Sequence, residues 1–220
     1  MTTLPTPPDA VVFDCDGLLV DSEPWWERAE VDMFARRGLV LTTEQRAPLM
    51  GKSSWEVADY LTEVFHEPGC RDALVDELLG SVTELIRANV VAMPGAHHLV
   101  RAVARTGVPM AVASNSPRDI VSACLEGAGL DGLIHNIVSI EDVVYPKPAP
   151  DPYLVACERC GAAPSKSVGF EDSPIGLASA VAAGLFTVAV PSPSIGELDG
   201  DLVVPSLTDP VLTKWVASWR

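Results

Sequence analysis

From residue 95 onward, short apolar segments alternate with helical segments, and this alternation limits the fold of the chain more than any other feature. The expected helices cover residues 95–106, 117–128, 150–160 and 174–183. The expected strands cover residues 108–113, 137–138, 167–170, 186–190 and 202–204. Strands that alternate with helices form a mainly parallel sheet with helices on both faces. The sequence therefore predicts an α/β fold with a Rossmann-like parallel sheet at its core.

A long helical stretch separates this region from one further strand near the N-terminus. Ala10-Val11-Val12-Phe13 is a short apolar run that ends in acid, as expected of a buried parallel strand. Residues 22–90 have apolar side chains at helical spacing, with no convincing strand among them. Because the first strand has to join the sheet across this stretch, we expect an all-helical cap domain over residues 20–92. It would interrupt an α/β core formed by residues 1–19 and 93–220.

Charge and hydropathy limit the partners of the chain. It has 15 basic and 30 acidic residues, a net charge of −15, while 48% of its residues are hydrophobic and can form a sizeable core. Such a charge repels nucleic acid and anionic membrane surfaces, so neither is an expected partner. A site for a phosphate group would need cations concentrated next to it. We expect a monomer or a weak homodimer.

The N-terminus and the cysteines favour a cytoplasmic protein. The first residues lack the basic and apolar segments of a signal peptide. The longest uncharged run, residues 173–196, is broken by proline and glycine into a short helix and a strand. The five cysteines are an odd number without the spacing of a disulfide framework. Cys157 and Cys160 form a lone C-x-x-C, and we expect two incidental thiols there instead of a redox or zinc site.

Two aspartates follow the first strand directly. Asp14 and Asp16 precede Gly17, and Asp-Gly is common in ordinary turns. In an extended chain, however, residues two positions apart point the same way, so these two carboxylates would repel each other. A bound divalent cation removes that penalty. The pair therefore favours a functional site over a plain turn.

Polar residues also follow a second strand, where Ser114-Asn115-Ser116-Pro117 comes after residues 108–113. Ser116 is expected to be a helix N-cap, with Pro117 at the first helical position. This leaves Ser114 and Asn115 free beside a helix N-terminus, where an anion binds readily.

The third and fourth polar clusters carry a lysine and two acids. Lys147 lies between prolines and is either a solvated turn residue or a cation held toward a site. Glu171 and Asp172 end a buried strand, where they could be oxygen ligands for Mg²⁺. Asp172 or Ser173 could instead cap the next helix. Because ligands bind at the carboxyl ends of parallel strands, the four clusters are expected to meet in one site.

These four motifs in this order resemble the haloacid dehalogenase superfamily, in the branch of β-phosphoglucomutases and sugar- or polyol-phosphate phosphatases with a helical cap. The resemblance covers nearly the whole chain. The matching segments are Asp14-Cys15-Asp16-Gly17, Ser114-Asn115-Ser116, Lys147-Pro148 and Glu171-Asp172-Ser173-Pro174.

The resemblance implies a Mg²⁺-dependent phosphatase acting on a small-molecule phosphate ester. Asp14 would be the nucleophile that forms an aspartyl-phosphate, and Asp16 would be the general acid and base. The metal would be held by the Asp14 side chain, the Asp16 backbone carbonyl, Asp172 and, directly or through water, Glu171. Ser114, the N–H of Asn115 and Lys147 would hold the transferring phosphate oxygens.

The cap would supply contacts to the rest of the substrate, and it would close through hinges near residues 18–22 and 90–95. Glu23, Trp26 and Gly51-Lys52-Ser53 are the candidates for the cap side of the pocket. Tryptophan is more often a core residue of a helix than part of a binding surface, and Lys52 could be a solvated loop charge.

Single residues separate the possible activities. Dehalogenases lack the second aspartate of the first motif, and phosphonoacetaldehyde hydrolases carry a small residue there, so Asp16 argues against both. β-Phosphoglucomutases have a cap histidine ten residues after that aspartate, where this chain has Trp26. We therefore expect hydrolysis of sugar or polyol phosphates, with mutase-type transfer as the alternative. A non-catalytic sensor of phosphorylated ligands is the third possibility, and the intact set of Asp14, Asp16, Lys147 and Asp172 argues against it.

Overall fold

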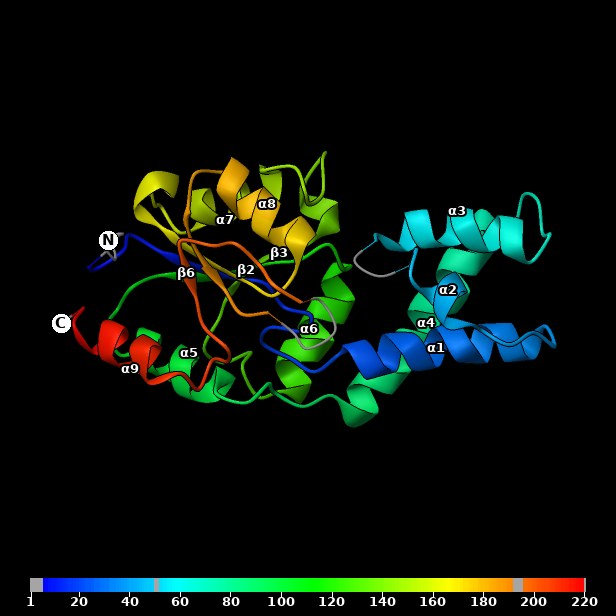
Figure 1. The fold of residues 1–220 in the computed structure, drawn as a ribbon, viewed down its shortest axis with the longest axis horizontal. Coiled ribbons are helices and arrows are strands. Elements are labelled where there is room, and N and C mark those ends of the chain that lie inside the picture. Colours follow the sequence, from blue (N-terminus) through cyan, green and yellow to red (C-terminus); the bar gives the residue numbers. More distant parts are fainter. Residues whose placement is uncertain (1–5, 50–51, 192–195, 220) are drawn as a thin grey trace.

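A computed structural model describes residues 6–49, 52–191 and 196–219. Its centre is a six-stranded parallel sheet with the strand order β3-β2-β1-β4-β5-β6 (Figure 1). The strands are β1 (Val11–Phe13), β2 (Met110–Ala113), β3 (Asn136–Val138), β4 (Val168–Glu171), β5 (Phe186–Ala189) and β6 (Leu202–Val203). The sheet confirms the predicted fold. The first strand, although separated by the helical stretch, lies in the middle, between β2 and β4.

Helices cover both faces of the sheet because successive strand residues point to opposite sides. On one face, Val12 of β1 packs with residues of α7 (Asp151–Arg159) and α8 (Pro174–Ala182). On the other face, Val11 and Phe13 pack with residues of α5 (Ala96–Ala104), α6 (Arg118–Gly127) and α9 (Pro210–Ala217). Figure 1 shows these two helical layers above and below the strands. Two short 3₁₀ helices, η1 (Ile140–Asp142) and η2 (Pro164–Lys166), complete the core.

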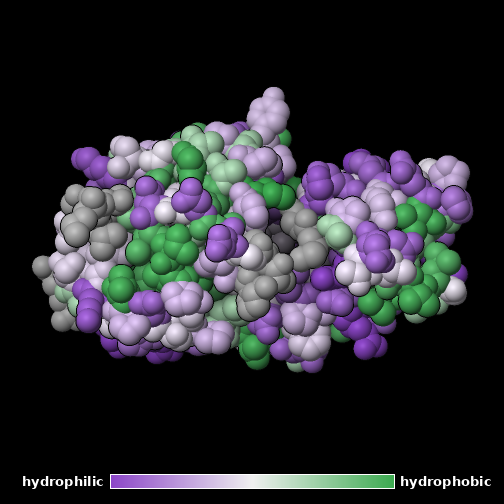
Figure 2. Space-filling view, in the orientation of Figure 1, coloured by the Kyte–Doolittle hydropathy of each residue, from purple (hydrophilic) through white to green (hydrophobic). Residues whose placement is uncertain are grey.

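Four helices between β1 and α5 form a separate layer at one end of the molecule, and we call them the cap (Figure 1). They are α1 (Glu23–Arg36), α2 (Thr43–Arg46), α3 (Ser54–Val64) and α4 (Arg71–Asn89). Capping boxes begin two of them, with Thr42 and Gln45 at α2 and Ser53 and Glu56 at α3. Hydrophilic residues cover much of the visible face of the cap (Figure 2). The predicted helical cap is thus confirmed.

The two segments that connect the cap to the sheet run side by side. The N–H of Asp21 donates to the carbonyl of Val91 at 3.0 Å, and the N–H of Met93 donates to the carbonyl of Leu19 at 2.9 Å. Buried apolar residues of the cap and of the α5–α6–α9 layer also form one continuous cluster. The cap is therefore joined to the core both by a paired connection and by shared packing.

The uncharged run at residues 173–196 contains helix α8 and strand β5, as predicted. In the ranges that the structure describes, no helix has the length and hydropathy needed to cross a membrane.

Candidate active site

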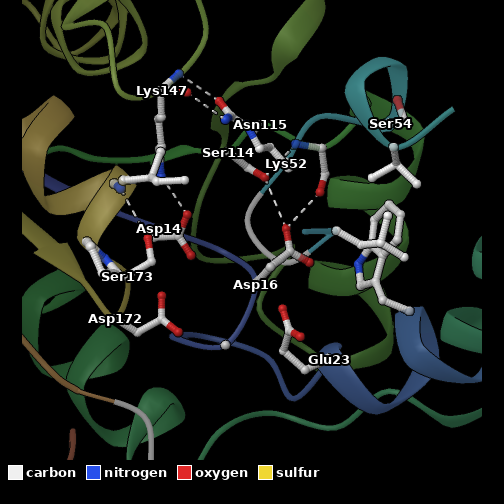
Figure 3. Close-up of a pocket in the computed structure, with 18 of the residues that line it drawn as sticks. Asp14, Asp16, Glu23, Lys52, Ser54, Ser114, Asn115, Lys147, Asp172 and Ser173 are labelled. Atoms are coloured by element: carbon white, nitrogen blue, oxygen red, sulfur yellow. Dashed lines mark hydrogen bonds and ion pairs between the residues drawn. The ribbon is translucent and has the colours of Figure 1, made fainter. Parts of the chain in front are cut away.

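The carboxyl ends of β1, β2 and β4 face the cap across a cavity of about 510 Å³. The core contributes the residues that follow these strands, and the cap contributes residues of α1, α2 and α3 (Figure 3). Because β1 lies between β2 and β4, the side chains that follow these three strands meet at a single edge of the sheet.

Asp14 and Lys147 form a buried ion pair in this cavity (Figure 3). The Nζ of Lys147 lies 2.6 Å from Oδ1 of Asp14 and 2.6 Å from Oε1 of Glu171. Burial alone would lower the pKa of Lys147, but the two carboxylates outweigh it and raise that pKa above its usual value. Burial raises the pKa of Asp14 to about 8, while Lys147 acts in the opposite direction. The lysine is therefore a permanent cation held directly against the predicted nucleophile.

Glu171 is fully buried behind Lys147 and is not among the residues that line the cavity. Its Oε1 accepts hydrogen bonds from Lys147 and from the hydroxyl of Tyr153, the latter at 2.7 Å. Its Oε2 accepts from the hydroxyl of Ser173 at 3.2 Å. The side chain of Glu171 therefore holds Lys147 in place from the interior of the core. Tyr153 in turn holds Glu171, and sequence reasoning did not single out this tyrosine.

Asp172 faces the cavity, and its carboxylate has room there because the residue opposite, Gly17, has no side chain. Gly17 has φ +83°, and a Cβ built on it would collide with the carboxylate of Asp172. Burial raises the pKa of Asp172 well above its usual value, and the neighbouring carboxylate of Asp14 adds to the effect. Ser173 also caps α8 by accepting from the N–H of Gly176, as the plainer interpretation of this motif proposed.

Asp14, Glu171 and Asp172 place carboxylate oxygens within 4.8 Å of one another. One lysine does not neutralise three carboxylates, so repulsion from Asp14 and Glu171 adds to the effect of burial in raising the pKa of Asp172. Oxygen donors of this kind suit Mg²⁺. A second group of potential ligands in the described chain, Cys15, Asp16 and Cys124, offers two sulfur atoms and does not suit that ion. The residues at the sheet edge thus fit a divalent cation.

Asp16 accepts three hydrogen bonds from serine hydroxyls. Ser22 donates to Oδ1 at 2.7 Å, and Ser116 and Ser114 donate to Oδ2 at 2.9 and 3.1 Å. Figure 3 shows Ser114 beside Asp16. The expectation that Ser116 caps a helix is wrong. Pro117 occupies the N-cap of α6, and the carboxylate of Glu141 accepts from the N–H of Arg118. Ser116 is therefore free to hold the predicted acid, and Ser22 does so from the cap connection.

The structure brings Ser114 and Asn115 to the cavity as predicted. The N–H of Ser116 donates to the hydroxyl of Ser114 at 3.0 Å. The side chain of Asn115 is tied to the backbone of Lys147: it accepts from the lysine N–H at 2.9 Å and donates to the lysine carbonyl at 3.1 Å. These two bonds hold the lysine loop against the end of β2.

Three predicted cap residues, Glu23, Trp26 and Lys52, line the cavity. Lys52 is paired with Glu56 at 3.0 Å, and Gly51 lies outside the described residues. Sequence reasoning missed further cap residues there, among them Arg46 and Glu30. The spacing of the acids at 23, 27 and 30 on one helix was a signal that could have indicated a cation partner. The cysteines at 157 and 160 are free thiols, as are the other three.

Comparison with known proteins identifies the family. The family model described as haloacid dehalogenase-like hydrolase matches residues 8–184. The chain belongs to the haloacid dehalogenase-like hydrolases. Hexitol phosphatase B of Escherichia coli K12 is 30% identical to this chain over 187 residues, and the match covers 84% of each chain. Fructose-1-phosphate phosphatase YqaB of the same strain is 30% identical over 180 residues, 82% of this chain and 95% of YqaB.

Among solved structures, CbbY from Rhodobacter sphaeroides in complex with phosphate has the same fold, with a TM-score of 0.81 and 22% identity. The match covers 92% of this chain and 96% of CbbY. The predicted family and fold are both confirmed. This haloacid dehalogenase-like hydrolase is a phosphoric monoester hydrolase, as predicted.

Proposed function

We propose that this enzyme is a Mg²⁺-dependent phosphatase that hydrolyses sugar or polyol phosphates through an aspartyl-phosphate. One observation carries the proposal: Asp14 lies 2.6 Å from a buried lysine, with Asp16 lining the same cavity. The names of the two similar phosphatases, for hexitol and fructose 1-phosphate, support the substrate class.

In the first step, a carboxylate oxygen of Asp14 attacks phosphorus while the bond from phosphorus to the ester oxygen breaks. Lys147 supplies positive charge to the phosphate oxygens, and the hydroxyl of Ser114 and the N–H of Asn115 donate to them. Asp16 gives its proton to the departing oxygen, so that the leaving group departs as an alcohol. The hydroxyls of Ser22 and Ser116 keep its carboxyl group in one orientation during this transfer, while the hydroxyl of Ser114 turns from Asp16 to the phosphate.

In the second step, the carboxylate of Asp16 takes a proton from a water molecule, whose oxygen attacks phosphorus. The bond between phosphorus and Asp14 breaks, inorganic phosphate leaves, and both aspartates return to their first state. Mg²⁺ would be held by the side chains of Asp14 and Asp172 and the backbone carbonyl of Asp16. When bound, it offsets the repulsion between carboxylate and phosphate. Glu171 contributes by holding Lys147.

Transfer to water is favoured over mutase-type transfer by the residue at position 26. The mutase branch uses a cap histidine there to control the acid, whereas this chain places a tryptophan on the cavity wall. The carboxylate of Asp16 is held by Ser22, Ser114 and Ser116 instead of by an imidazole from the cap. Among the described residues, no cap histidine contacts Asp16, so none would delay the acid until a sugar phosphate arrives.

Phosphate release from a panel of sugar, polyol and nucleotide monophosphates, measured with Mg²⁺, tests the proposal. Asp14→Asn keeps the shape of the side chain but removes the nucleophile, so we expect activity to fall by at least about a thousandfold. The variant should also fail to incorporate ³²P from labelled substrate after an acid quench. Equal, slow hydrolysis by the wild type and Asp14→Asn would contradict the proposal. Faster isomerisation of β-glucose 1-phosphate than phosphate release would favour the mutase.

A further inference from the structure

The cap wall of the cavity is built around one arginine that is shared by three carboxylates. Arg46 of α2 lies 3.6 Å from Glu23, 3.4 Å from Glu27 and 3.2 Å from Glu30. The three acids follow one another along α1 at spacings of four and three residues, which places them on one face of the helix. Glu23, Glu30 and Arg46 line the cavity, whereas Glu27 does not.

This wall carries an excess of negative charge toward the substrate. Burial raises the pKa of Glu30 to about 7, against the opposing effect of Arg46. Even when Glu30 is protonated, Glu23 and Glu27 still face a single guanidinium. The electrostatic potential on the cap side of the cavity is therefore negative, whereas a site that binds anions usually has a positive potential.

The other cations of the cavity do not compensate for this charge. Among the described lining residues, Lys52 is paired with Glu56, and Lys147 is held between Asp14 and Glu171. Lys147 belongs to the reacting phosphate. A second phosphate or a carboxylate on the substrate would thus meet carboxylates on the cap wall and would have to displace an existing ion pair to gain a cation.

Glu23 is the carboxylate best placed to contact the leaving group. Figure 3 shows its side chain reaching toward Asp16, and the charge of Asp16 is one of the causes that raise the pKa of Glu23, after burial. Since Asp16 protonates the leaving oxygen and Glu23 lines the same cavity, the leaving group of a bound ester passes beside Glu23. Its carboxylate lies 3.6 Å from Arg46 and keeps lone pairs that can accept from hydroxyl groups.

The cap side of the cavity also carries apolar side chains, next to Lys52 and Ser54. Trp26, Leu49 and Val57 line this side of the cavity. Glu23 can accept hydrogen bonds from hydroxyl groups, and the apolar side chains next to it can pack against C–H groups. This combination suits a ligand with hydroxyl groups on one side and C–H groups on the other.

From these contacts we propose that the cap wall selects phosphate esters whose leaving group is uncharged and rich in hydroxyls, with Glu23 accepting hydrogen bonds from them. Esters with a second phosphate or a carboxylate are disfavoured by repulsion from Glu23, and from Glu30 when it is ionised. This inference rests on the proposed function and narrows its substrate class by charge.

Two six-carbon esters test the inference because they differ only at one end. Sorbitol 6-phosphate carries a CH₂OH group where 6-phosphogluconate carries a carboxylate. Each ester is assayed for kcat/KM with Mg²⁺, and phenyl phosphate serves as the reference ester without hydroxyls. For the wild type we expect sorbitol 6-phosphate to be preferred by about ten- to a hundredfold. This lies between the roughly fivefold effect of two like charges about 4 Å apart in water and the roughly thousandfold effect of the same pair near a protein surface.

Matched variants assign the selection to Glu23. Glu23→Gln should reduce the preference about tenfold, and Glu23→Lys should bring the two esters to similar kcat/KM. Glu27→Gln removes one charge from the same arginine but outside the cavity, so the preference should fall much less than in Glu23→Gln. Circular dichroism melts of all variants establish that they are folded.

The outcomes separate the two ideas. Wild-type hydrolysis of both esters within about twofold, or an equal loss of preference in Glu27→Gln and Glu23→Gln, would overturn the inference while leaving the phosphatase intact. Hydrolysis of phenyl phosphate without hydrolysis of sorbitol 6-phosphate would overturn it as well. If the folded wild type released phosphate from none of these esters or the wider panel, the proposed function would fail, and the inference with it.

Discussion

Replacing Tyr153 by Phe tests whether Lys147 is held in place by Glu171, its buried partner. The tyrosine side chain is fully buried, and its hydroxyl donates to Oε1 of Glu171 at 2.7 Å. The substitution removes this hydrogen bond but keeps the ring, so the packing around α7 changes little. A hydrogen bond to a charged group contributes about 1.5–3 kcal/mol to stability. We expect the free energy of unfolding to fall by that amount, which for a chain of this length lowers Tm by roughly 3–12 °C.

Tyr153→Phe should also slow the reaction. Without the tyrosine hydroxyl, Lys147 is the remaining donor to Oε1 of Glu171, which draws the lysine away from Asp14. We expect kcat to fall about tenfold while KM changes much less, because the loss affects the transferring phosphate more than the leaving group.

Urea unfolding followed by circular dichroism and steady-state kinetics measure the two effects of Tyr153→Phe. Tyr145→Phe is the matched control, since Tyr145 lies two residues before Lys147 with most of its side chain exposed. That variant should match the wild type in both measurements. The reasoning is refuted if Tyr153→Phe unfolds within about 0.5 kcal/mol of the wild type, or if it loses stability without any loss of kcat.

Three further predictions concern the glycine, the cation and the cap acid. Gly17→Ala should lower Mg²⁺ affinity and kcat by at least about tenfold, because the new Cβ displaces Asp172 and the backbone has positive φ; an unchanged Mg²⁺ titration would contradict this. Chelation by EDTA should abolish activity, and added Mg²⁺ should restore it. Mg²⁺ should also raise the Tm of the wild type, but not the Tm of a variant that lacks both Asp14 and Asp172. Relative to Glu30→Gln, the wild type should lose about 1–3 kcal/mol of stability as pH rises from about 4.5 to about 8. The sign follows because the pKa of Glu30 is raised to about 7 in the folded state, so that ionisation costs more there than in the unfolded chain; parallel urea titrations across this pH range would reveal an opposite slope.

Much of the sheet and its site could be predicted because local patterns and global fold agree. The apolar runs became β1, β2, β4 and β5 within two residues of the predicted ends. Ser173 and Pro174 begin α8 as the capping rules require. The polar residues after these strands meet because parallel strands present their carboxyl ends at the same edge.

Adjacent acids could not be assigned to their surroundings from the sequence. Glu171 and Asp172 are neighbours, and successive residues of an extended chain point to opposite sides. No local pattern says which of the two faces the cavity. In the structure Asp172 does, while Glu171 lies inside with Lys147 and Tyr153.

Tertiary contacts also decided the roles of Ser116 and Arg46. Capping propensity favoured a local role for Ser116, but the carboxylate of Asp16 competed for its hydroxyl, and Glu141 took over the helix N–H. Arg46 reaches the cavity through the packing of α2 against α1, and this packing depends on contacts between segments more than fifteen residues apart. Periodicity within one helix does not report such contacts.

The paired segments at residues 19–21 and 91–93 make the cap an exchangeable module. Because Leu19 and Met93 are hydrogen-bonded neighbours on antiparallel backbones, a turn of two residues could close the chain where the cap now stands. A different cap could enter at the same point without altering the order of the strands. The proposed bond-breaking residues Asp14, Asp16 and Lys147 all lie outside the exchanged segment. Recognition of the leaving group can therefore evolve by replacing one module, while the chemistry of phosphate transfer is inherited unchanged.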